Sequence, residues 1–210
     1  MLTIMNTPSN QIALAWKTLT ESVFAFLALF FMSPFLLLIV ILIKLDSKGP
    51  AIFKQKRVGL RGRQFYIYKF RTMVVNAEEL KEKLAEKNES DGPTFKIKED
   101  PRITRIGGFL RKTSLDEVPQ LFNVLKGEMS LIGPRPPLPK EVEEYERWQL
   151  RRLSVKPGIT CTWQIIPNRN DVLFEKWMKL DLHYIDNWSI KNDIGLIFKT
   201  VKSVFTNKGY

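Results

Sequence analysis

Residues 23–43, VFAFLALFFMSPFLLLIVILI, contain no charged side chain. As one straight helix this stretch would be roughly 30 Å long, about the thickness of the hydrocarbon core of a bilayer. Ser33 and Pro34 lie almost at its midpoint. Proline removes one intrahelical hydrogen bond, and the serine hydroxyl can bond a backbone carbonyl one turn back. The sequence therefore predicts a kinked helix in a membrane.

Two topologies fit this stretch. Hydropathy alone favours a single-pass helix with a tolerated proline kink. The alternative is a re-entrant helix–break–helix that enters one leaflet and turns back, which would leave both ends on the same side. Basic residues follow the apolar stretch directly and favour an inside location for the rest of the chain. They are Lys44, Lys48, Lys54, Lys56, Arg57, Arg61 and Arg63.

A length of 210 residues allows one membrane element and one further domain with its own core. The formal charge of +11 favours anionic lipid and phosphate-bearing ligands. Nucleic acid is the competing partner, but no zinc-finger, helix-turn-helix or RNA-binding signature accompanies the charge. The single cysteine, Cys161, excludes an internal disulfide and fits a reducing cytoplasm. Cys161 and His183 cannot form a zinc-type site, so any metal should have oxygen ligands.

The rest of the chain reads as a small α+β domain that is mostly helical. Two β-like segments around a glycine-bearing turn predict a hairpin, at 51–58 and 64–70. Helices are predicted at 77–87, 119–125, 140–153 and 172–184, and a strand at 159–166. The last helix carries an apolar stripe, which either packs in the core or lies on a membrane surface. The stripe consists of Ile194, Ile197, Phe198, Val201, Val204 and Phe205.

Asp116 and Glu117 are the most suggestive acidic pair. The spacing Ser114-x-x-Glu117 fits a capping box, so the pair can be explained by the start of a helix alone. Pro119 complicates that explanation, because it would delete a hydrogen bond in the second turn and make the backbone irregular. Near a helix N-terminus both carboxylates should stay ionised. An ionised aspartate can attack phosphorus, and a neighbouring glutamate can hold Mg²⁺.

Basic residues cluster before and after the acidic pair. For each of them alone, a solvated surface charge is the simpler interpretation. Arg135 is the exception, because it is locked between prolines and a rigidly placed guanidinium suits bidentate phosphate binding. The cluster comprises Lys69, Arg71, Arg102, Arg105, Arg111 and Arg135.

From about Thr18 onward the chain resembles the bacterial sugar transferase family, the monotopic polyprenyl-phosphate phosphoglycosyl transferases. Five separated motifs occur in the family's order and together make the resemblance specific. They are SPFLLLI, KFRTM, RKTSLDEVPQLFNVLKGEMSLIGPRP, RRLSVKPGIT, and LDLHYIDNWSIKNDI with IFKT after it.

The resemblance implies a reaction. Asp116 would attack the β-phosphate of a UDP-sugar, release UMP and form a phosphosugar-aspartyl intermediate. Polyprenyl (undecaprenyl) phosphate would then take the sugar phosphate, which starts exopolysaccharide, capsule or O-antigen synthesis. Glu117 would bind Mg²⁺, and Lys69, Arg111 and Arg135 would bind phosphates. We expect Arg71, from the same basic cluster, to bind substrate as well.

The resemblance also implies an organisation. Ser33 and Pro34 would form the break of a re-entrant hairpin, which reverses the preference from hydropathy. We expect an N-terminal segment at 1–17, the membrane element at 18–45 and a phosphoglycosyl transferase domain at 46–210. That domain would lie on the cytoplasmic face of the bacterial inner membrane, with amphipathic interface helices. Membrane lipid would be a partner, no nucleic acid would be, and a homodimer is compatible with this arrangement.

One departure from the family pattern is visible at Cys161, where the family usually has glycine. A cysteine there would be strained if the backbone needs a positive φ. We expect residues 164–171 to help select the sugar, with glucose or galactose as the first choices. The alternative function is a catalytically inactive, membrane-anchored scaffold of the same pathway.

Overall fold

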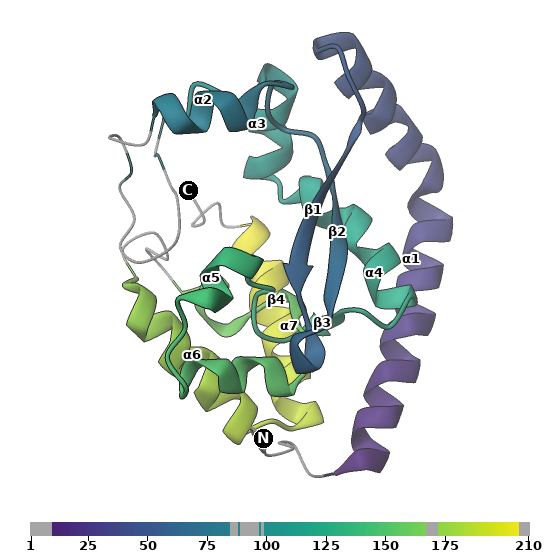
Figure 1. Ribbon diagram of the computed structural model, residues 1–210. Coiled ribbons are helices and arrows are strands. Elements are labelled where there is room, and N and C mark those ends of the chain that lie inside the picture. The colour runs from purple at the N-terminus through teal and green to yellow at the C-terminus, as the bar shows by residue number, and fades with distance from the viewer. Residues whose placement is uncertain (1–9, 85–87, 89–96, 98, 167–171, 206–210) are drawn as a thin grey trace.

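Helix α1, Gln11–Asp46, runs along one side of the molecule and sets its long dimension (Figure 1). The structure is a computed structural model and describes residues 10–84, 88, 97, 99–166 and 172–205. At the start of the helix the Asn10 side chain accepts a hydrogen bond from the backbone of Ala13 and so satisfies one of the otherwise unpaired N–H groups. By length and composition α1 is the one helix of the described residues that is apolar enough to cross a membrane. It begins before the predicted start of the membrane element at residue 18, and the predicted domain division stays a prediction.

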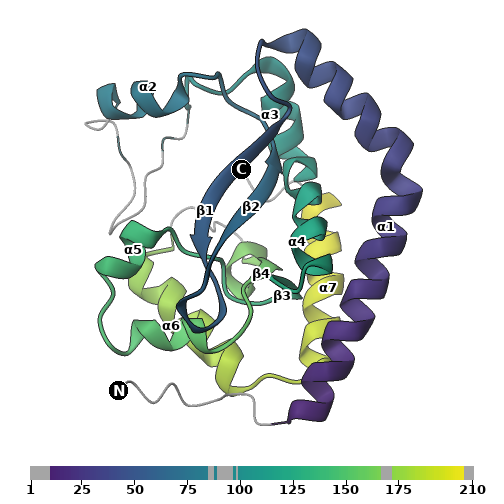
Figure 2. The same cartoon turned by 45° about the vertical axis from the view of Figure 1, so that its right-hand side comes forward.

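The predicted break into two helices at Ser33 and Pro34 is not present, because α1 is continuous through both residues. Pro34 has no N–H to donate to the carbonyl of Phe30. The Ser33 hydroxyl donates to that same carbonyl at 2.8 Å, as the sequence suggested. The serine thus replaces the hydrogen bond that the proline removes, so the helix bends without breaking. Figure 2 shows α1 bowed around the rest of the molecule.

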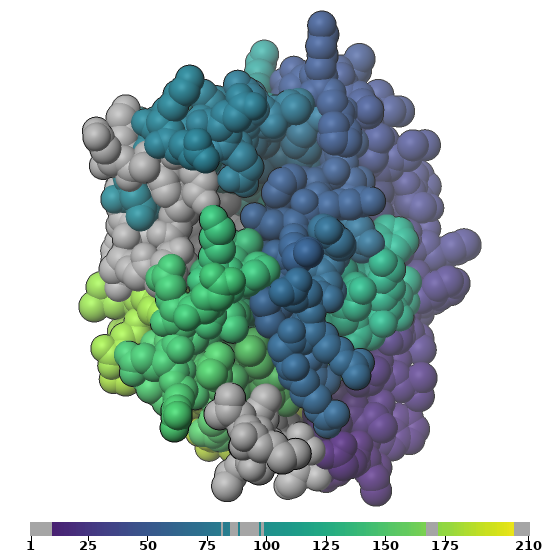
Figure 3. Space-filling model, viewed as in Figure 1, coloured from purple at the N-terminus to yellow at the C-terminus, as the bar shows by residue number. Residues whose placement is uncertain are grey.

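The predicted hairpin is confirmed. Strands β1, Ile52–Val58, and β2, Gln64–Phe70, pair antiparallel from Ile52 opposite Phe70 to Val58 opposite Gln64. The turn contains a short 3-10 helix, η1, Leu60–Gly62, in which Arg61 has a φ of 56°. Figure 3 shows the hairpin crossing the front face, with α5 on one side and α4 on the other.

Short helices occupy the space around the hairpin. They are α2 (Ala77–Lys83), α3 (Arg105–Lys112), the 3-10 helix η3 (Leu115–Gln120) and α4 (Leu121–Leu125). The described part of the predicted helix 77–87 is confirmed as far as Lys83, and residues 85–87 lie outside the described residues. The predicted helix 119–125 begins as η3 and becomes α-helical at Leu121. No pattern in the sequence indicated α3.

A second, parallel sheet joins β3, Ser130–Ile132, to β4, Gly158–Thr160. The predicted strand at 159–166 is therefore too long, since the chain enters the 3-10 helix η5, Thr162–Ile165, directly afterwards. The two segments of this sheet approach each other closely at Gly158, where an added Cβ atom would lie 2.1 Å from the backbone nitrogen of Gly133. This contact fixes the proline-rich segment that carries Arg135.

The predicted single helix at 140–153 is wrong. The chain forms α5, Pro139–Glu143, and then the 3-10 helix η4, Gln149–Ser154. Buried polar contacts explain the interruption. Arg152 donates to the hydroxyl of Tyr145 at 2.7 Å and lies 2.6 Å from Asp181, so tertiary contacts override the helical pattern between α5 and η4.

The remaining helices, α6 (Phe174–Asp186) and α7 (Ile190–Phe205), agree with the predictions. The stripe on α7 does not pack in the core as a whole, because Ile194, Phe198 and Val201 are exposed. Leu196, from another face of the helix, packs against the cluster formed by Ile132, Tyr184 and Ile185. The described side chains thus support a surface role for the stripe.

Helix α1 contributes to two of the hydrophobic clusters among the described residues. Ala25 and Leu29 pack with α4 and β2, and Ile39 and Ile43 pack with α3 and the outer end of the hairpin. Each such large aliphatic side chain stabilises the fold by roughly 1.5–3 kcal/mol when buried. The opposite face of α1 is apolar and exposed, with Phe31 at 74%. The domain therefore lies alongside α1 over both of its halves, and the fold is α+β and mostly helical.

Candidate active site

Asp116 and Glu117 lie on η3, directly after α3. The chain enters η3 at Ser114, which has a left-handed backbone with a φ of 57°. The Ser114 side chain makes no capping hydrogen bond, so the predicted capping box is wrong. Pro119 lies inside η3, and the irregular backbone expected from it is confirmed. A left-handed serine costs roughly 1 kcal/mol or more, and such strain concentrates at functional sites.

Lys69 at the end of β2 holds Glu117. The Lys69 Nζ atom is 2.5 Å from the Glu117 Oε1 atom, and each side chain is 26% exposed. The structure thus brings together two residues that the sequence separates widely. Because the pair is only partly open to solvent, water screens its attraction less than that of a surface ion pair.

The pKa of Asp116 departs from its ordinary value. Burial raises the pKa from 3.8 to about 6, and the carboxylate of Glu117 adds to the rise, whereas Lys69 and Arg111 lower it. Burial outweighs the nearby positive charge, so Asp116 loses its charge closer to neutral pH than an exposed aspartate does. Its charge changes just below neutral pH.

Arg111 reaches the acidic pair from the last turn of α3. Its Nε atom donates to the Thr72 hydroxyl at 2.9 Å. Among the described residues its terminal nitrogens have no hydrogen-bond partner, so they are available to an anion. Gly107 sets this position, because a Cβ atom there would lie 2.1 Å from the Thr72 carbonyl oxygen. Only glycine allows α3 to approach the end of β2 so closely.

Arg135 lies in the proline-rich segment after β3. Its carbonyl accepts a hydrogen bond from Arg152 at 3.1 Å, and its guanidinium lies 6.0 Å from the centre of the Trp163 ring. The backbone is thus held from one side and the charged group from the other. This agrees with the rigid guanidinium predicted from the sequence.

Arg57 on β1 lies against the segment that carries Arg135, and sequence reasoning did not single it out. Burial, and then the charge of Arg135, lower the pKa of Arg57 to about 10, while Glu141 and, less strongly, Glu117 oppose this shift. Its guanidinium donates to Gln55 and to the carbonyl of Pro136. The sequence shows Arg57 only as one of several charges in the hairpin, so no signal distinguished it from its exposed neighbours.

Arg71 does not join the group. Its Nη1 atom donates to the Pro50 carbonyl at 2.7 Å, and its Nη2 atom donates to the Ser47 carbonyl at 2.6 Å and hydroxyl at 2.8 Å. The side chain is buried and fastens the end of α1 to the hairpin. These contacts give Arg71 a structural role, and its expected substrate-binding role stays a prediction.

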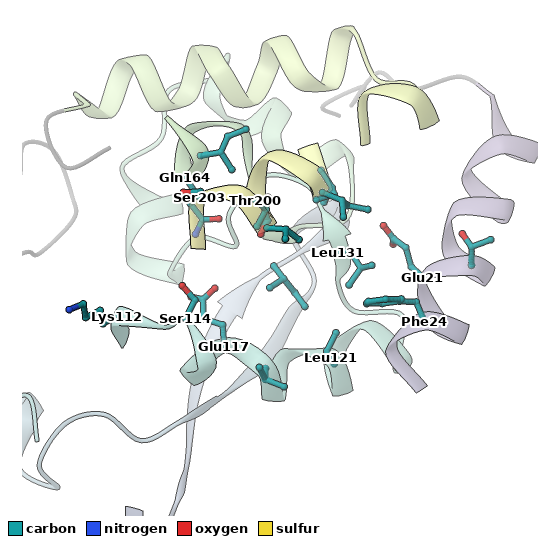
Figure 4. Close-up of a pocket in the computed structure, with 18 residues that line it drawn as sticks. Glu21, Phe24, Lys112, Ser114, Glu117, Leu121, Leu131, Gln164, Thr200 and Ser203 are labelled. Carbon is teal, nitrogen blue, oxygen red and sulfur yellow. The ribbon is translucent and has the colours of Figure 1, made fainter. Parts of the chain in front are cut away.

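A cavity of about 740 Å³ adjoins the acidic pair (Figure 4). Lys112, Ser114 and Glu117 lie at one end of it, and Glu21 and Phe24 of α1 lie at the other. Helix α7 and the segment around η5 cover another side. The cavity therefore leads from the acidic pair to the apolar helix.

The donor set fits a magnesium ion better than a zinc ion. Among the described residues no group of three histidine, cysteine or acidic side chains could hold a metal. Mg²⁺ needs fewer protein ligands, since it is usually bound by one or two carboxylates together with substrate phosphates. Asp116 and Glu117 offer such carboxylates beside basic residues that suit phosphates.

Cys161 is not strained where the family usually has glycine. Its φ is −132°, an extended conformation that any residue adopts, and its side chain is buried. Its N–H donates to the Gln164 side chain at 3.0 Å, and Gln164 lines the cavity. Of the stretch expected to help select the sugar, residues 167–171 lie outside the described residues.

The geometry defines a class of site: a carboxylate of raised pKa beside a lysine-bound glutamate, with arginines placed for phosphate. The comparisons agree with this class. The model of the family described as "Bacterial sugar transferase" matches residues 12–207. The chain therefore belongs to this family.

Curated relatives extend the comparison. The chain is 54% identical over 161 residues to "Galactosyl transferase CpsE" of Streptococcus agalactiae, covering 77% of this chain and 36% of that protein. It is 43% identical over 216 residues to "Undecaprenyl-phosphate galactose phosphotransferase" of Salmonella typhimurium, covering 100% of this chain and 44% of the relative. It is 40% identical over 189 residues to "Exopolysaccharide production protein ExoY" of Sinorhizobium fredii, covering 88% of this chain and 83% of the relative. The chain thus spans less than half the length of the first two relatives.

Proposed function

We propose that this protein is a phosphoglycosyl transferase that moves a hexose-1-phosphate from a UDP-sugar to polyprenyl (undecaprenyl) phosphate. The observation that carries the proposal is the placement of Asp116, with its raised pKa, beside Glu117, Lys69 and Arg111. Phosphoryl transfer depends mainly on positioning and charge neutralisation, which this group provides. Relatives named for galactose transfer and exopolysaccharide production support the substrate class and the pathway.

The reaction takes place in two steps. In the first, a carboxylate oxygen of Asp116 bonds to the phosphorus that carries the sugar, the bond from that phosphorus to the bridging oxygen breaks, and UMP leaves with the bonding electrons. In the second, a phosphate oxygen of the polyprenyl phosphate attacks the same phosphorus, and Asp116 leaves as a carboxylate. The covalent intermediate allows a soluble donor and a lipid acceptor to use one site in turn.

The basic residues have separate parts in this scheme. Lys69 and Arg111 lie close enough to shift the pKa of Asp116 and would offset the charge of the donor diphosphate. Arg135, whose guanidinium is fixed over Trp163, would bind a donor phosphate from the other side. Glu117 would hold Mg²⁺, which supplies further neutralisation of the diphosphate when bound.

We place α1 within one leaflet of the bacterial inner membrane and the domain on the cytoplasmic face. Helix α4 packs on the middle of α1 (Figures 1 and 2). The exposed Lys126 follows α4 directly. A helix that crossed the bilayer would carry this flanking polar surface into hydrocarbon, at a cost of several kcal/mol per charge. A bowed helix with its outer face in lipid avoids that cost. Exposed basic residues in the last turn of α1 and directly after it, such as Lys44 and Lys48, suit the anionic cytoplasmic leaflet.

The proposal is tested by UMP release. Purified protein in nanodiscs is incubated with Mg²⁺ and a panel of UDP-sugars that includes UDP-galactose and UDP-glucose, with and without polyprenyl phosphate. We expect sustained UMP release that requires one donor and the lipid. Asp116→Asn should lower the rate by roughly a thousandfold or more, whereas Asp186→Asn, which disturbs only an exposed ion pair with Arg151, should leave it unchanged. Folded wild-type protein that releases no UMP with any donor would support the scaffold instead.

A further inference from the structure

The cavity beside the acidic pair has two chemically different ends. One end is formed by Ser114 and Glu117, next to the carboxylate that forms the proposed intermediate. The other end is a rim between α1 and α7. Three of its lining side chains are also exposed, Phe24 at 56%, Ile197 at 40% and Val201 at 49%. The cavity thus runs from the acidic pair, where Lys112 is also exposed, to the exposed apolar side chains of α1 and α7.

The wall between the two ends is mainly aliphatic. It consists of Val118, Leu121, Leu131, Ile132, Ile159 and Ile165. In Figure 4 Leu121 and Leu131 lie between the labelled Glu117 and Phe24. An aliphatic wall of this extent favours a hydrocarbon ligand and offers little to a sugar.

Several polar groups of the lining are already occupied by the protein. The Thr200 hydroxyl donates to the carbonyl of Leu196 at 2.8 Å. The Glu21 carboxylate accepts a hydrogen bond from the Ser130 hydroxyl at 2.8 Å. A hydroxyl-rich ligand would have to compete with these bonds, whereas an apolar one leaves them in place.

We propose that this cavity holds the first isoprene units of the acceptor, with the acceptor's phosphate at the Ser114–Glu117 end and its chain leaving between α1 and α7. This inference rests on the proposed function. The cavity volume of about 740 Å³ is that of a site for a drug-sized ligand, which is enough for several isoprene units but not for a whole long polyprenyl chain. The remaining chain enters the bilayer at the rim, beside the exposed apolar face of α1.

The proposal makes Ile197 and Val201 determinants of acceptor chain length. A larger side chain at either rim position reduces the space for the isoprene chain, so long-chain acceptors lose affinity while the donor contacts near Asp116 stay in place. The matched control is Ile194→Trp, the same substitution one turn earlier on α7, at an exposed position outside the lining.

The experiment measures KM for polyprenyl phosphates with one to eleven isoprene units, using Ile197→Trp, Val201→Trp and Ile194→Trp. Rates are normalised to active enzyme by the burst of UMP released without acceptor. In the wild type, KM should fall as isoprene units are added and then level off when the cavity is full. Ile197→Trp and Val201→Trp should raise KM for long acceptors about tenfold, and Ile194→Trp should match the wild type.

A chain-length dependence that is the same in all the variants would overturn the proposal. A wild-type protein without any UMP burst would instead refute the proposed function, so the two failures are distinct.

Cross-linking adds a second measurement. A polyprenyl phosphate with a photoreactive group on an early isoprene unit should label peptides from α4 or α7, and labelling confined to the outer face of α1 would contradict the cavity. Labelling by a photoreactive phospholipid that excess polyprenyl phosphate does not displace would mean that a membrane lipid occupies the cavity, and would also overturn the proposal.

Discussion

Asp116 lies on η3, which follows the turn at Ser114 and packs against β2. Burial removes water from the charged form and raises the pKa to about 6. Lys69 and Arg111 oppose this rise without cancelling it. A carboxylate with this pKa is mostly ionised at neutral pH and is a stronger base than an exposed aspartate.

The first testable consequence is the pH dependence of the UMP burst. Because the proposed mechanism needs the ionised form of Asp116, the burst rate should rise with pH, reach half its maximum near pH 6 and level off above that. Lys69→Gln removes a positive charge that lowers the pKa, so the midpoint should move to higher pH. The midpoint is read from burst rates measured between pH 4.5 and 8.5.

Lys126→Gln is the control for that shift, because Lys126 is exposed and its ammonium donates to the Tyr68 hydroxyl outside the acidic pair. Its profile should keep the wild-type midpoint. A wild-type rate that does not change between pH 5 and 7 would show that Asp116 is ionised throughout this range and would contradict the burial argument.

The structure brings together the predicted site residues Asp116, Glu117, Lys69 and Arg111, whose roles stay predictions, and it places Arg71 apart from them. Lys69 and Arg71 are two residues apart, so the alternation of a strand would place both on one face. Strand β2 ends at Phe70, and Arg71 turns away to Ser47 and Pro50. The end of a strand is set by what packs against it, and the local pattern does not show this.

Helix α3 packs against α1 through Leu110 and approaches the chain after β2 most closely at a glycine. Gly107 lies against the carbonyl of Thr72, and the Thr104 side chain caps the same turn by accepting a hydrogen bond from the N–H of Gly107. Arg111 lies one helical turn after Gly107, and the left-handed residue Ser114 follows the end of α3. The position of the acidic pair relative to β2 therefore depends on the absence of a side chain at residue 107.

Gly107→Ala should therefore destabilise the protein by roughly 1–3 kcal/mol, because the added methyl group forces α3 away from β2. The displacement should also lower the UMP burst rate. The matched control is Gly195→Ala in α7, where a Cβ atom meets nothing within 4 Å. That variant should be neutral or more stable by roughly 0.5–1 kcal/mol, since alanine favours a helix. Denaturant unfolding compares the two, and equal stabilities would contradict the packing argument.

Elements held by local signals were predictable, and those held by tertiary contacts were not. The hairpin, α6 and α7 follow from periodicity and turn residues. The segment 140–153 has a helical pattern, yet the contacts of Arg152 with Tyr145 and Asp181 interrupt it. Helix α3 was not predicted, because Gly107 and Gly108 lower the helical propensity of this segment. Gly107 is nevertheless required for the close contact of α3 with the Thr72 carbonyl.

At the scale of the whole molecule, α1 and the domain form one body with an apolar outer face. The sequence indicated a membrane helix with a special site at Ser33 and Pro34, and it did not show that the bend would occur without a break. The sequence also did not predict how much of the inner face of α1 the domain covers. This depends on tertiary packing, because α4 packs against the first half of α1 and α3 against the second. The proposed position in one leaflet follows from this packing.

That position predicts where reagents reach the ends of α1. Ile12 and Leu45 are both exposed near its two ends. Single-cysteine variants Ile12→Cys and Leu45→Cys, in proteoliposomes of one orientation, should react with a membrane-impermeant maleimide from the same side. Phe31→Cys should be protected from the reagent by lipid. The native Cys161 is buried, and Lys140→Cys on the domain surface reports which side the domain occupies. Reaction of Ile12→Cys and Leu45→Cys from opposite sides would restore the single-pass topology.

The most direct test of the central claim is the mass of the protein after reaction with donor alone. Wild-type protein is mixed with Mg²⁺ and its UDP-sugar in the absence of polyprenyl phosphate, quenched in acid and examined by intact-protein and peptide mass spectrometry. We predict an added mass of one hexose phosphate on the peptide that contains Asp116, which disappears when polyprenyl phosphate is supplied and never forms in Asp116→Asn. An enzyme that turns over with donor and acceptor yet gains no mass under any quench would contradict the covalent mechanism.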